Sequence, residues 1–224
     1  MKTIKSLKEY LRLNTLDIRS SKKGIGLRLF HIGILLLAAA PSISFLLLTI
    51  SSIFGSLRRR DNYFIDKYNT PFLFASILMI INCIIKSHHN EFKNINYDNW
   101  IGLINWIPFF WCFWGFQPYL EKQNVRKMIA KLIVIGSIPV IISGFLQYFF
   151  NITGPFQILN GLIIWYQKPI SLTDGLTGPF NNANYAGSWL TLVWPFSLYY
   201  FLTNEKKSKK IVTAIICFLF ITSI

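Results

Sequence analysis

The sequence predicts an all-α fold, a polytopic bundle of about six or seven membrane helices with a short interfacial helix in its main outside loop. Two observations predict this fold class. Hydrophobic residues make up 53% of the 224 residues and charged residues only 14%, whereas a soluble domain carries roughly 25% charged residues. The charges also gather in clusters between long uncharged stretches, as expected of a chain that passes repeatedly between lipid and water.

The apolar stretches are the expected membrane elements, because a helix of about 20 apolar residues crosses the hydrocarbon core. In chain order they are residues 29–57, 70–85, 100–120, 132–150, 185–202 and 211–224. The last stretch holds only 14 residues and ends with the sequence. It is too short to span, so we expect the chain to be a truncated product, a fragment or the product of a split gene.

The first stretch has two interpretations. Residues 29–57 form either a hairpin of two short helices that turns near Ala40-Pro41-Ser42, or a single span kinked at Pro41. Pro41 favours a turn because proline lacks a backbone N–H and disfavours helix at the preceding residue. The hairpin also keeps the basic residues on both sides of the stretch in the same compartment, but its two helices are short for a membrane.

The basic residues predict the orientation. Four segments, 1–28, 58–67, 121–131 and 204–210, hold 20 of the 23 Lys and Arg residues. Basic loops stay in the cytoplasm, so we expect a basic cytoplasmic segment at 1–28, a membrane domain at 29–224 and a multi-pass location. The abundance of Ile, Lys and Asn indicates an AT-rich bacterial genome. Because the positive charges flank apolar runs, the net charge of +14 does not indicate a nucleic-acid partner.

Polar residues inside the apolar stretches are expected to hydrogen-bond between helices, because an unpaired polar group is costly in lipid. These residues are His31, Asn82, Asn105 and Gln147. The three cysteines lie in apolar segments without disulfide or zinc spacing, and the pair His88-His89 is poorly placed for one metal ion. The sequence therefore predicts neither a metal nor a cofactor.

The connection between residues 151 and 187 carries most of the functional information. It is expected outside and begins with an apolar piece, 156–166, which we interpret as the interfacial helix with Trp165 and Tyr166 at headgroup level. Asn181, Asn182 and Asn184 then precede an apolar helix expected from Tyr185. Either these asparagines only cap that helix, or its N-terminus also binds an anion.

The run from Gly178 to Gly187, GPFNNANYAG, resembles a segment of the O-antigen ligase and polymerase family, in which a similar run enters a membrane helix from the periplasm. The order of the apolar stretches is also similar. The resemblance implies a glycosyltransferase-type protein of cell-surface polysaccharide or lipopolysaccharide assembly. Such a protein acts on glycans carried by undecaprenyl pyrophosphate.

The candidate substrate-binding residues are Lys168, Asn181, Asn182, Asn184 and Tyr185. Lys168 is included because a lone outside cation near a helix N-terminus can meet a pyrophosphate; a lysine that only reaches the lipid headgroups is the alternative. The family's functional Arg and His residues belong to its C-terminal half, so no catalytic residue is assigned in this chain. We therefore expect the N-terminal half of such a domain, inactive alone, with the lipid bilayer and a separately encoded C-terminal half as partners.

Two other functions fit the same residues. A transporter or channel for a small anion uses broken helix ends facing the membrane in this way. A membrane scaffold without any ligand is the third possibility, in which the asparagines serve only as helix caps.

Overall fold

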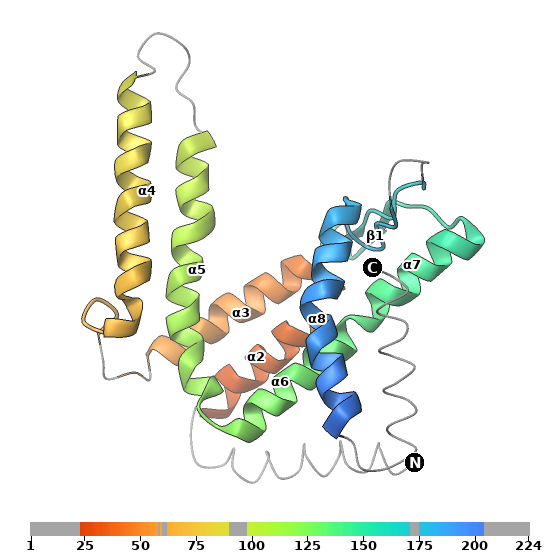
Figure 1. Ribbon diagram of the computed structural model, residues 1–224, viewed down its shortest axis with the longest axis horizontal. Coiled ribbons are helices and arrows are strands. Elements are labelled where there is room, and N and C mark those ends of the chain that lie inside the picture. Colours follow the sequence, from red (N-terminus) through yellow and green to blue (C-terminus); the bar gives the residue numbers. More distant parts are fainter. Residues whose placement is uncertain (1–22, 58, 60–61, 90–97, 171–174, 204–224) are drawn as a thin grey trace. The chain divides into compact units, whose positions relative to one another are not determined.

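The computed structural model (Figure 1) describes residues 23–57, 59, 62–89, 98–170 and 175–203. These residues are mostly helical, which confirms the helical fold class. The elements are α2 (Lys23–Leu36), α3 (Pro41–Ser56), η2 (Lys67–Asn69), α4 (Thr70–His89), α5 (Asp98–Leu120), α6 (Gln123–Gly136), α7 (Ile138–Phe150), β1 (Phe156–Ile158), β2 (Ile163–Trp165) and α8 (Ala183–Thr203). The basic segment 1–22, the loop 204–210 and the stretch 211–224 lie outside the described residues.

The chain forms two compact units. The first consists of Met1–Gly26 and Thr49–Glu121, and the second of Leu27–Leu48 and Lys122–Ile224. Helices α2 and α3 contribute residues to both units, α4 and α5 belong to the first, and α6 to α8 belong to the second. The candidate site residues all lie in the second unit.

The first apolar stretch is a helical hairpin, so the single kinked span is wrong. Helix α2 ends at Leu36, and α3 begins at Pro41, where the missing N–H of proline costs no helical hydrogen bond. In the second unit, Ser44 Oγ donates to the carbonyl oxygen of Gly33 at 2.7 Å. In the first unit, Ser51 Oγ donates to the carbonyl oxygen of Gly26 at 2.9 Å. The residue numbers fall in one helix as they rise in the other, so the two helices are antiparallel.

Two segments among the described residues are long and apolar enough to cross a membrane by length and composition. They are Lys67–Ser87, which is almost entirely α4, and Gln123–Phe150, which joins α6 and α7. The join lies at Ser137, whose backbone N–H still bonds to the carbonyl oxygen of Ile133. Pro139 follows and cannot donate to the preceding turn, which explains why the helix is interrupted there.

Helix α8 runs antiparallel to the α6–α7 pair in the second unit. Trp189, near the start of α8, donates its Nε1–H to Ser137 Oγ at 2.9 Å. Tyr200, near the end of α8, donates its hydroxyl to the carbonyl oxygen of Lys127 at the start of α6. The apolar core between these helices contains Val134, Val140, Ile141, Leu190 and Val193. The start of α8 therefore lies toward the end of α7 and the segment that follows it.

The predicted interfacial helix at 156–166 is wrong, because this piece forms the antiparallel hairpin β1–β2. Asn160 and Gly161 occupy the left-handed region, with φ of 53° and 85°. An Asn-Gly pair favours such a turn because glycine has no Cβ and asparagine tolerates a positive φ. The β-branched Ile163 and Ile164 then favour a strand, so local backbone preference decides against a helix.

Candidate functional site

The start of α8 is capped by an asparagine side chain. Helix α8 begins at Ala183, two residues before the expected start at Tyr185. Asn182 Oδ1 accepts a hydrogen bond of 2.7 Å from the backbone N–H of Asn184. The carbonyl oxygen of Asn182 also accepts from the backbone N–H of Ala186 at 3.3 Å. Asn182 therefore has the geometry of an N-cap residue, as one of the two interpretations of these asparagines expected.

The other polar candidates at this helix start are exposed. Asn181 precedes the cap, and Asn184 and Tyr185 lie in the first turn of α8. The side chain of Tyr185 is 61% exposed. These three exposed side chains lie at or next to the N-terminus of α8, the end at which the helix dipole favours negative charge.

A buried glutamine holds the segment that leads to this helix. Gln147 of α7 is fully buried, and its Oε1 accepts hydrogen bonds from the backbone N–H groups of Thr177 at 3.1 Å and Gly178 at 3.0 Å. Its Nε2 donates to Thr177 Oγ1 at 3.2 Å and to the carbonyl oxygen of Lys168. We call Gln147, Lys168, Thr177 and Gly178 the Gln147 clamp. One side chain thus holds two separate backbone segments.

Gly178, the first residue of the run, fits the clamp because it has no side chain. Its φ is +53°, and a Cβ at this position would lie 3.3 Å from the carbonyl oxygen of Val140 on α7. A side chain would both strain the backbone and press on the helix. The glycine at position 178 therefore allows the start of the Gly178–Gly187 run to pack closely against α7.

A second buried glutamine closes the base of the β1–β2 hairpin. Ser143 Oγ, on the same helix as Gln147, donates to Gln167 Oε1 at 2.7 Å. Gln167 Nε2 donates to the carbonyl oxygen of Ile152 at 2.8 Å, and the Gln167 carbonyl oxygen accepts from the N–H of Gly154 at 2.9 Å. Ser143 and Gln167 are 1% and 2% exposed, so these bonds are protected from competition with water.

Lys168 joins the clamp through its backbone rather than its side chain. Its N–H donates to Thr177 Oγ1 at 3.1 Å, and its carbonyl oxygen accepts from Gln147. The side chain is exposed. The structure thus brings the backbone of Lys168 beside the beginning of the Gly178–Gly187 run, while Asn181, Asn184 and Tyr185 stand exposed further along that run.

Of the Gln147 clamp, sequence reasoning singled out Gln147, Lys168 and Gly178 and missed Thr177. Gln147 was expected to hydrogen-bond another helix, and it does find partners, but they belong to a connecting segment. No sequence pattern marked Thr177, Gln167 or Ser143 as a candidate site residue. Asn82 and Asn105 are exposed, which does not fit the expected hydrogen bonds between helices. Among the described residues, His31 Nε2 is buried without a hydrogen-bond partner.

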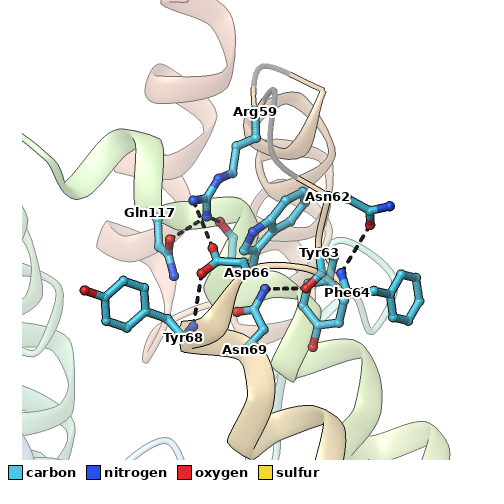
Figure 2. A network of polar contacts seen from close by, with 9 residues as sticks. Arg59, Asn62, Tyr63, Phe64, Asp66, Tyr68, Asn69 and Gln117 are labelled. Carbon is cyan, nitrogen blue, oxygen red and sulfur yellow. Dashed lines mark hydrogen bonds and ion pairs between the residues drawn. The ribbon is translucent and has the colours of Figure 1, made fainter.

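A second polar cluster lies in the first unit, where the predicted cytoplasmic loop meets α5 (Figure 2). Arg59 and Asp66 form an ion pair of 3.1 Å, with side chains only 16% and 9% exposed. Arg59 also donates to Gln117 Oε1, and its guanidinium lies 4.8 Å from the ring centre of Trp114. Arg59 is therefore used to fix the loop onto α5.

The rest of this loop is ordered by its own side chains. Asp66 Oδ1 accepts from the backbone N–H of Tyr68 at 3.0 Å and so caps η2. Asn69 is 1% exposed and donates its Nδ2–H to the carbonyl oxygen of Tyr63 at 3.0 Å (Figure 2). Burial raises the pKa of the Tyr63 phenol, which therefore stays neutral at physiological pH. These contacts describe a structural cluster.

Comparison with known proteins identifies no relative. No family model, curated protein or solved structure matches the chain. Within the described part of the chain, no group of three or more His, Cys, Asp or Glu side chains is placed to hold a metal ion. The function must therefore be argued from the residues themselves.

Proposed function

We propose that this chain is a multi-pass helical protein of the bacterial inner membrane, with about six or seven spans and a cytoplasmic N-terminus. We further propose that it binds a glycan carried on undecaprenyl pyrophosphate at the outer face, as the resemblance to O-antigen ligases and polymerases implies. One observation carries the proposal. The Gln147 clamp holds the backbone of Lys168 beside the run that opens α8, so an exposed lysine and a polar helix start are attached to the same buried side chain.

The distribution of charge along the second unit supports the orientation. Lys122, Arg126, Lys127 and Lys131 lie at or within the first part of α6. At the opposite end of the α6–α7 pair, residues 132–167 contain no Asp, Glu, Lys or Arg, and Lys168 is the first charge. Because positive loops are retained in the cytoplasm, this asymmetry favours the clamp and the start of α8 on the outer side.

The proposed chemistry uses each candidate residue differently. The Lys168 ammonium and the positive dipole end of α8 suit a pyrophosphate, because both favour negative charge. The amides of Asn181 and Asn184 suit sugar hydroxyls, since an amide both donates and accepts hydrogen bonds. Tyr185 offers an aromatic face to a sugar ring or to lipid. Asn182 acts through the cap, so its role is to position the helix end.

A binding measurement tests the proposal. The full chain in lipid nanodiscs is titrated with undecaprenyl pyrophosphate and, separately, with undecaprenyl phosphate. We expect the pyrophosphate to bind more tightly, and Lys168→Ala to weaken it about tenfold, the effect of losing one charge-assisted contact. Lys127→Ala, an exposed lysine at the other end of the helix pair, is the matched control and should bind as the unchanged protein does. Equal affinities for all three proteins would refute the site.

Orientation is tested separately by thiol labelling in intact cells. Cys83, Cys112 and Cys217 are replaced by alanine, and single cysteines are introduced at exposed Thr153 or at exposed Asn124. An impermeant reagent applied from the periplasm should label Thr153→Cys and should leave Asn124→Cys unlabelled. The reverse pattern would place the clamp in the cytoplasm and remove the basis for a periplasmic substrate.

A small-anion transporter or channel remains the second candidate. The favouring observation is that a non-helical segment with a positive φ at Gly178 leads directly into an exposed helix start, the arrangement that transporters use at broken helices. Flux of sulfate or phosphate into proteoliposomes, abolished by Lys168→Ala and without preference for a polyprenyl chain, would favour this function over glycan binding.

A further inference from the structure

The β1–β2 hairpin has a defined register and an apolar tip. Phe156 pairs with Trp165, Gln157 with Ile164 and Ile158 with Ile163, so residues 159–162 form the turn. Paired residues of antiparallel strands lie on the same face. At the tip, Leu159 and Leu162 are 63% and 49% exposed. The tip therefore presents leucine side chains to its surroundings.

The base of the hairpin is hydrogen-bonded to other parts of the second unit, and its tip is exposed. Trp165 donates its Nε1–H to the carbonyl oxygen of Ala39, in the turn between α2 and α3, at 2.7 Å. The backbone N–H of Tyr166 donates to the carbonyl oxygen of Pro179 at 3.1 Å. Gln167 closes the base through Ile152 and Gly154. These hydrogen bonds hold the hairpin, and with it the leucines of its tip, in the second unit.

The backbone conformation of Leu159 is unfavourable for leucine. Its φ is +54°, a left-handed region that leucine rarely adopts because its Cβ meets the backbone. Packing inside the unit does not offset the cost of this backbone conformation, since most of the leucine side chain is exposed. Local strain combined with exposure of a large apolar group is typical of a contact surface.

Large apolar side chains are also exposed at the end of α7. The last turn of α7 exposes Tyr148, Phe149 and Phe150 by 60%, 65% and 70%, directly before the hairpin. Residues 132–167 contain no charged side chain. Tyrosine and phenylalanine next to an uncharged apolar segment are the composition of a membrane–water boundary. A lipid surface is therefore the partner that this chemistry fits.

We infer that the β1–β2 hairpin inserts its Leu159–Leu162 tip into the outer leaflet, at the boundary between headgroups and acyl chains. The inference rests on the membrane placement of the proposed function and deepens it. Because Tyr166 and Lys168 follow β2 and pair with the segment that opens α8, a tip held in lipid sets the depth of the Gly178–Gly187 run. That depth corresponds to the level at which the pyrophosphate of a membrane-held carrier lies.

Depth-dependent quenching tests this contact in the full chain. Single cysteines at Leu159, at exposed Ile142 of α7 and at exposed Asn124 of α6 are introduced into the cysteine-free protein and labelled with an environment-sensitive dye. Vesicles then carry lipids with a doxyl group near the headgroup or near the end of the acyl chain. At Leu159 we expect headgroup-level doxyl to remove most of the emission and chain-end doxyl to remove little.

The controls separate the two proposals. Ile142→Cys should be quenched most by chain-end doxyl, and Asn124→Cys weakly by either lipid. If Ile142→Cys is quenched as expected but Leu159→Cys is not, the hairpin contact is wrong while the membrane placement stands. If neither is quenched, the membrane placement itself fails. Quenching or dye shift at Leu159 that depends on the protein-to-lipid ratio would identify a second copy of the chain as the occupant and overturn the lipid contact.

Replacing the tip leucines gives a second, independent readout. The double change Leu159→Asn with Leu162→Asn keeps the turn, because asparagine tolerates a positive φ. We expect a loss of most headgroup-level quenching for a dye placed at exposed Gln157. Unchanged quenching at Gln157 in this variant would show that the leucines do not hold the hairpin in lipid.

Discussion

Gln147 and Thr177 hydrogen-bond each other in both directions. The backbone N–H of Thr177 donates to Gln147 Oε1 at 3.1 Å, and Gln147 Nε2 donates to Thr177 Oγ1 at 3.2 Å. Both residues are buried, so neither bond competes with water. A primary amide can make such a reciprocal pair because it carries a donor and an acceptor side by side. This pair is the centre of the clamp that positions the start of α8.

Removing the Gln147 amide should loosen the clamp. Gln147→Leu keeps the approximate volume but leaves the backbone N–H groups of Thr177 and Gly178 without an acceptor. We expect the chain to lose about 1–3 kcal/mol of stability, the cost of unsatisfied buried polar groups. Hydrogen exchange in nanodiscs should show faster exchange at these two amides.

The control for this change is Gln157→Leu, at an exposed position on β1. It makes the same chemical replacement without removing a clamp contact, so exchange at Thr177 and Gly178 should not change. Equal protection of these amides in both variants would show that Gln147 does not hold the segment.

The cap of α8 separates a positioning role from a binding role. Asn182→Ala should destabilise the start of α8 by about 1 kcal/mol because the acceptor for the Asn184 N–H is lost, and Asn182→Asp should restore it. Asn181→Ala should leave stability unchanged, since its exposed side chain is not the cap. Thermal unfolding measured by circular dichroism in detergent reports these differences. A loss for Asn181→Ala equal to that for Asn182→Ala would contradict the assignment of the cap.

The sequence predicts the helices well where the preferences of neighbouring residues determine them. The apolar stretches at 70–85, 100–120 and 185–202 correspond to α4, α5 and α8. The turn near Pro41 could be predicted because proline acts on its own backbone and on the residue before it. The basic segments at either end of the apolar runs predict an orientation, but the partner residues of each helix do not follow from this pattern.

The hairpin and the clamp show where sequence reasoning falls short. Asn160-Gly161 signals a β-turn, but the hydrophobicity of residues 156–166 also suits a surface helix, and the turn preference decides the outcome. Gln147 is recognisable as a polar residue in an apolar stretch. Its partner could not be identified, because Thr177 lies 30 residues further along the chain and contacts Gln147 only in the folded unit.

Close packing of α3 on α5 in the first unit predicts opposite effects for similar glycine substitutions. A Cβ at Gly55 would overlap the carbonyl oxygen of Gly115, and a Cβ at Gly115 would lie 2.7 Å from the carbonyl oxygen of Ser52. Gly102, also on α5, has no neighbour within 4 Å of such a Cβ. Gly102→Ala should therefore stabilise its helix by roughly 0.5–1 kcal/mol, the usual gain over glycine.

Gly55→Ala should instead destabilise the protein by about 1–3 kcal/mol, because overpacking forces the two backbones apart. Melting temperatures of the two variants in the same detergent provide the comparison, with Gly102→Ala as the matched control. Two increases of similar size would mean that α3 and α5 do not approach each other at Gly55.

Arg59 and Asp66 should show measurable coupling, although many surface ion pairs contribute little. Their pair is 3.1 Å long and largely shielded from solvent, and Arg59 also contacts Gln117 and the ring of Trp114. A double-mutant cycle with Arg59→Ala and Asp66→Ala should give a coupling energy of about 0.5–3 kcal/mol. Arg59→Lys should recover only part of it, because lysine lacks the planar guanidinium that serves several acceptors at once.

Salt provides the control that distinguishes this pair from an exposed one. Screening at 1 M salt reduces interactions between solvent-exposed charges but affects shielded pairs much less. The coupling energy should therefore remain mostly intact when the cycle is repeated at high salt. Lys67→Ala, which removes an exposed charge from the same loop, should change stability by less than about 0.5 kcal/mol. A coupling energy near zero at both salt concentrations would mean that the loop is held by its packing on Trp114 rather than by the ion pair.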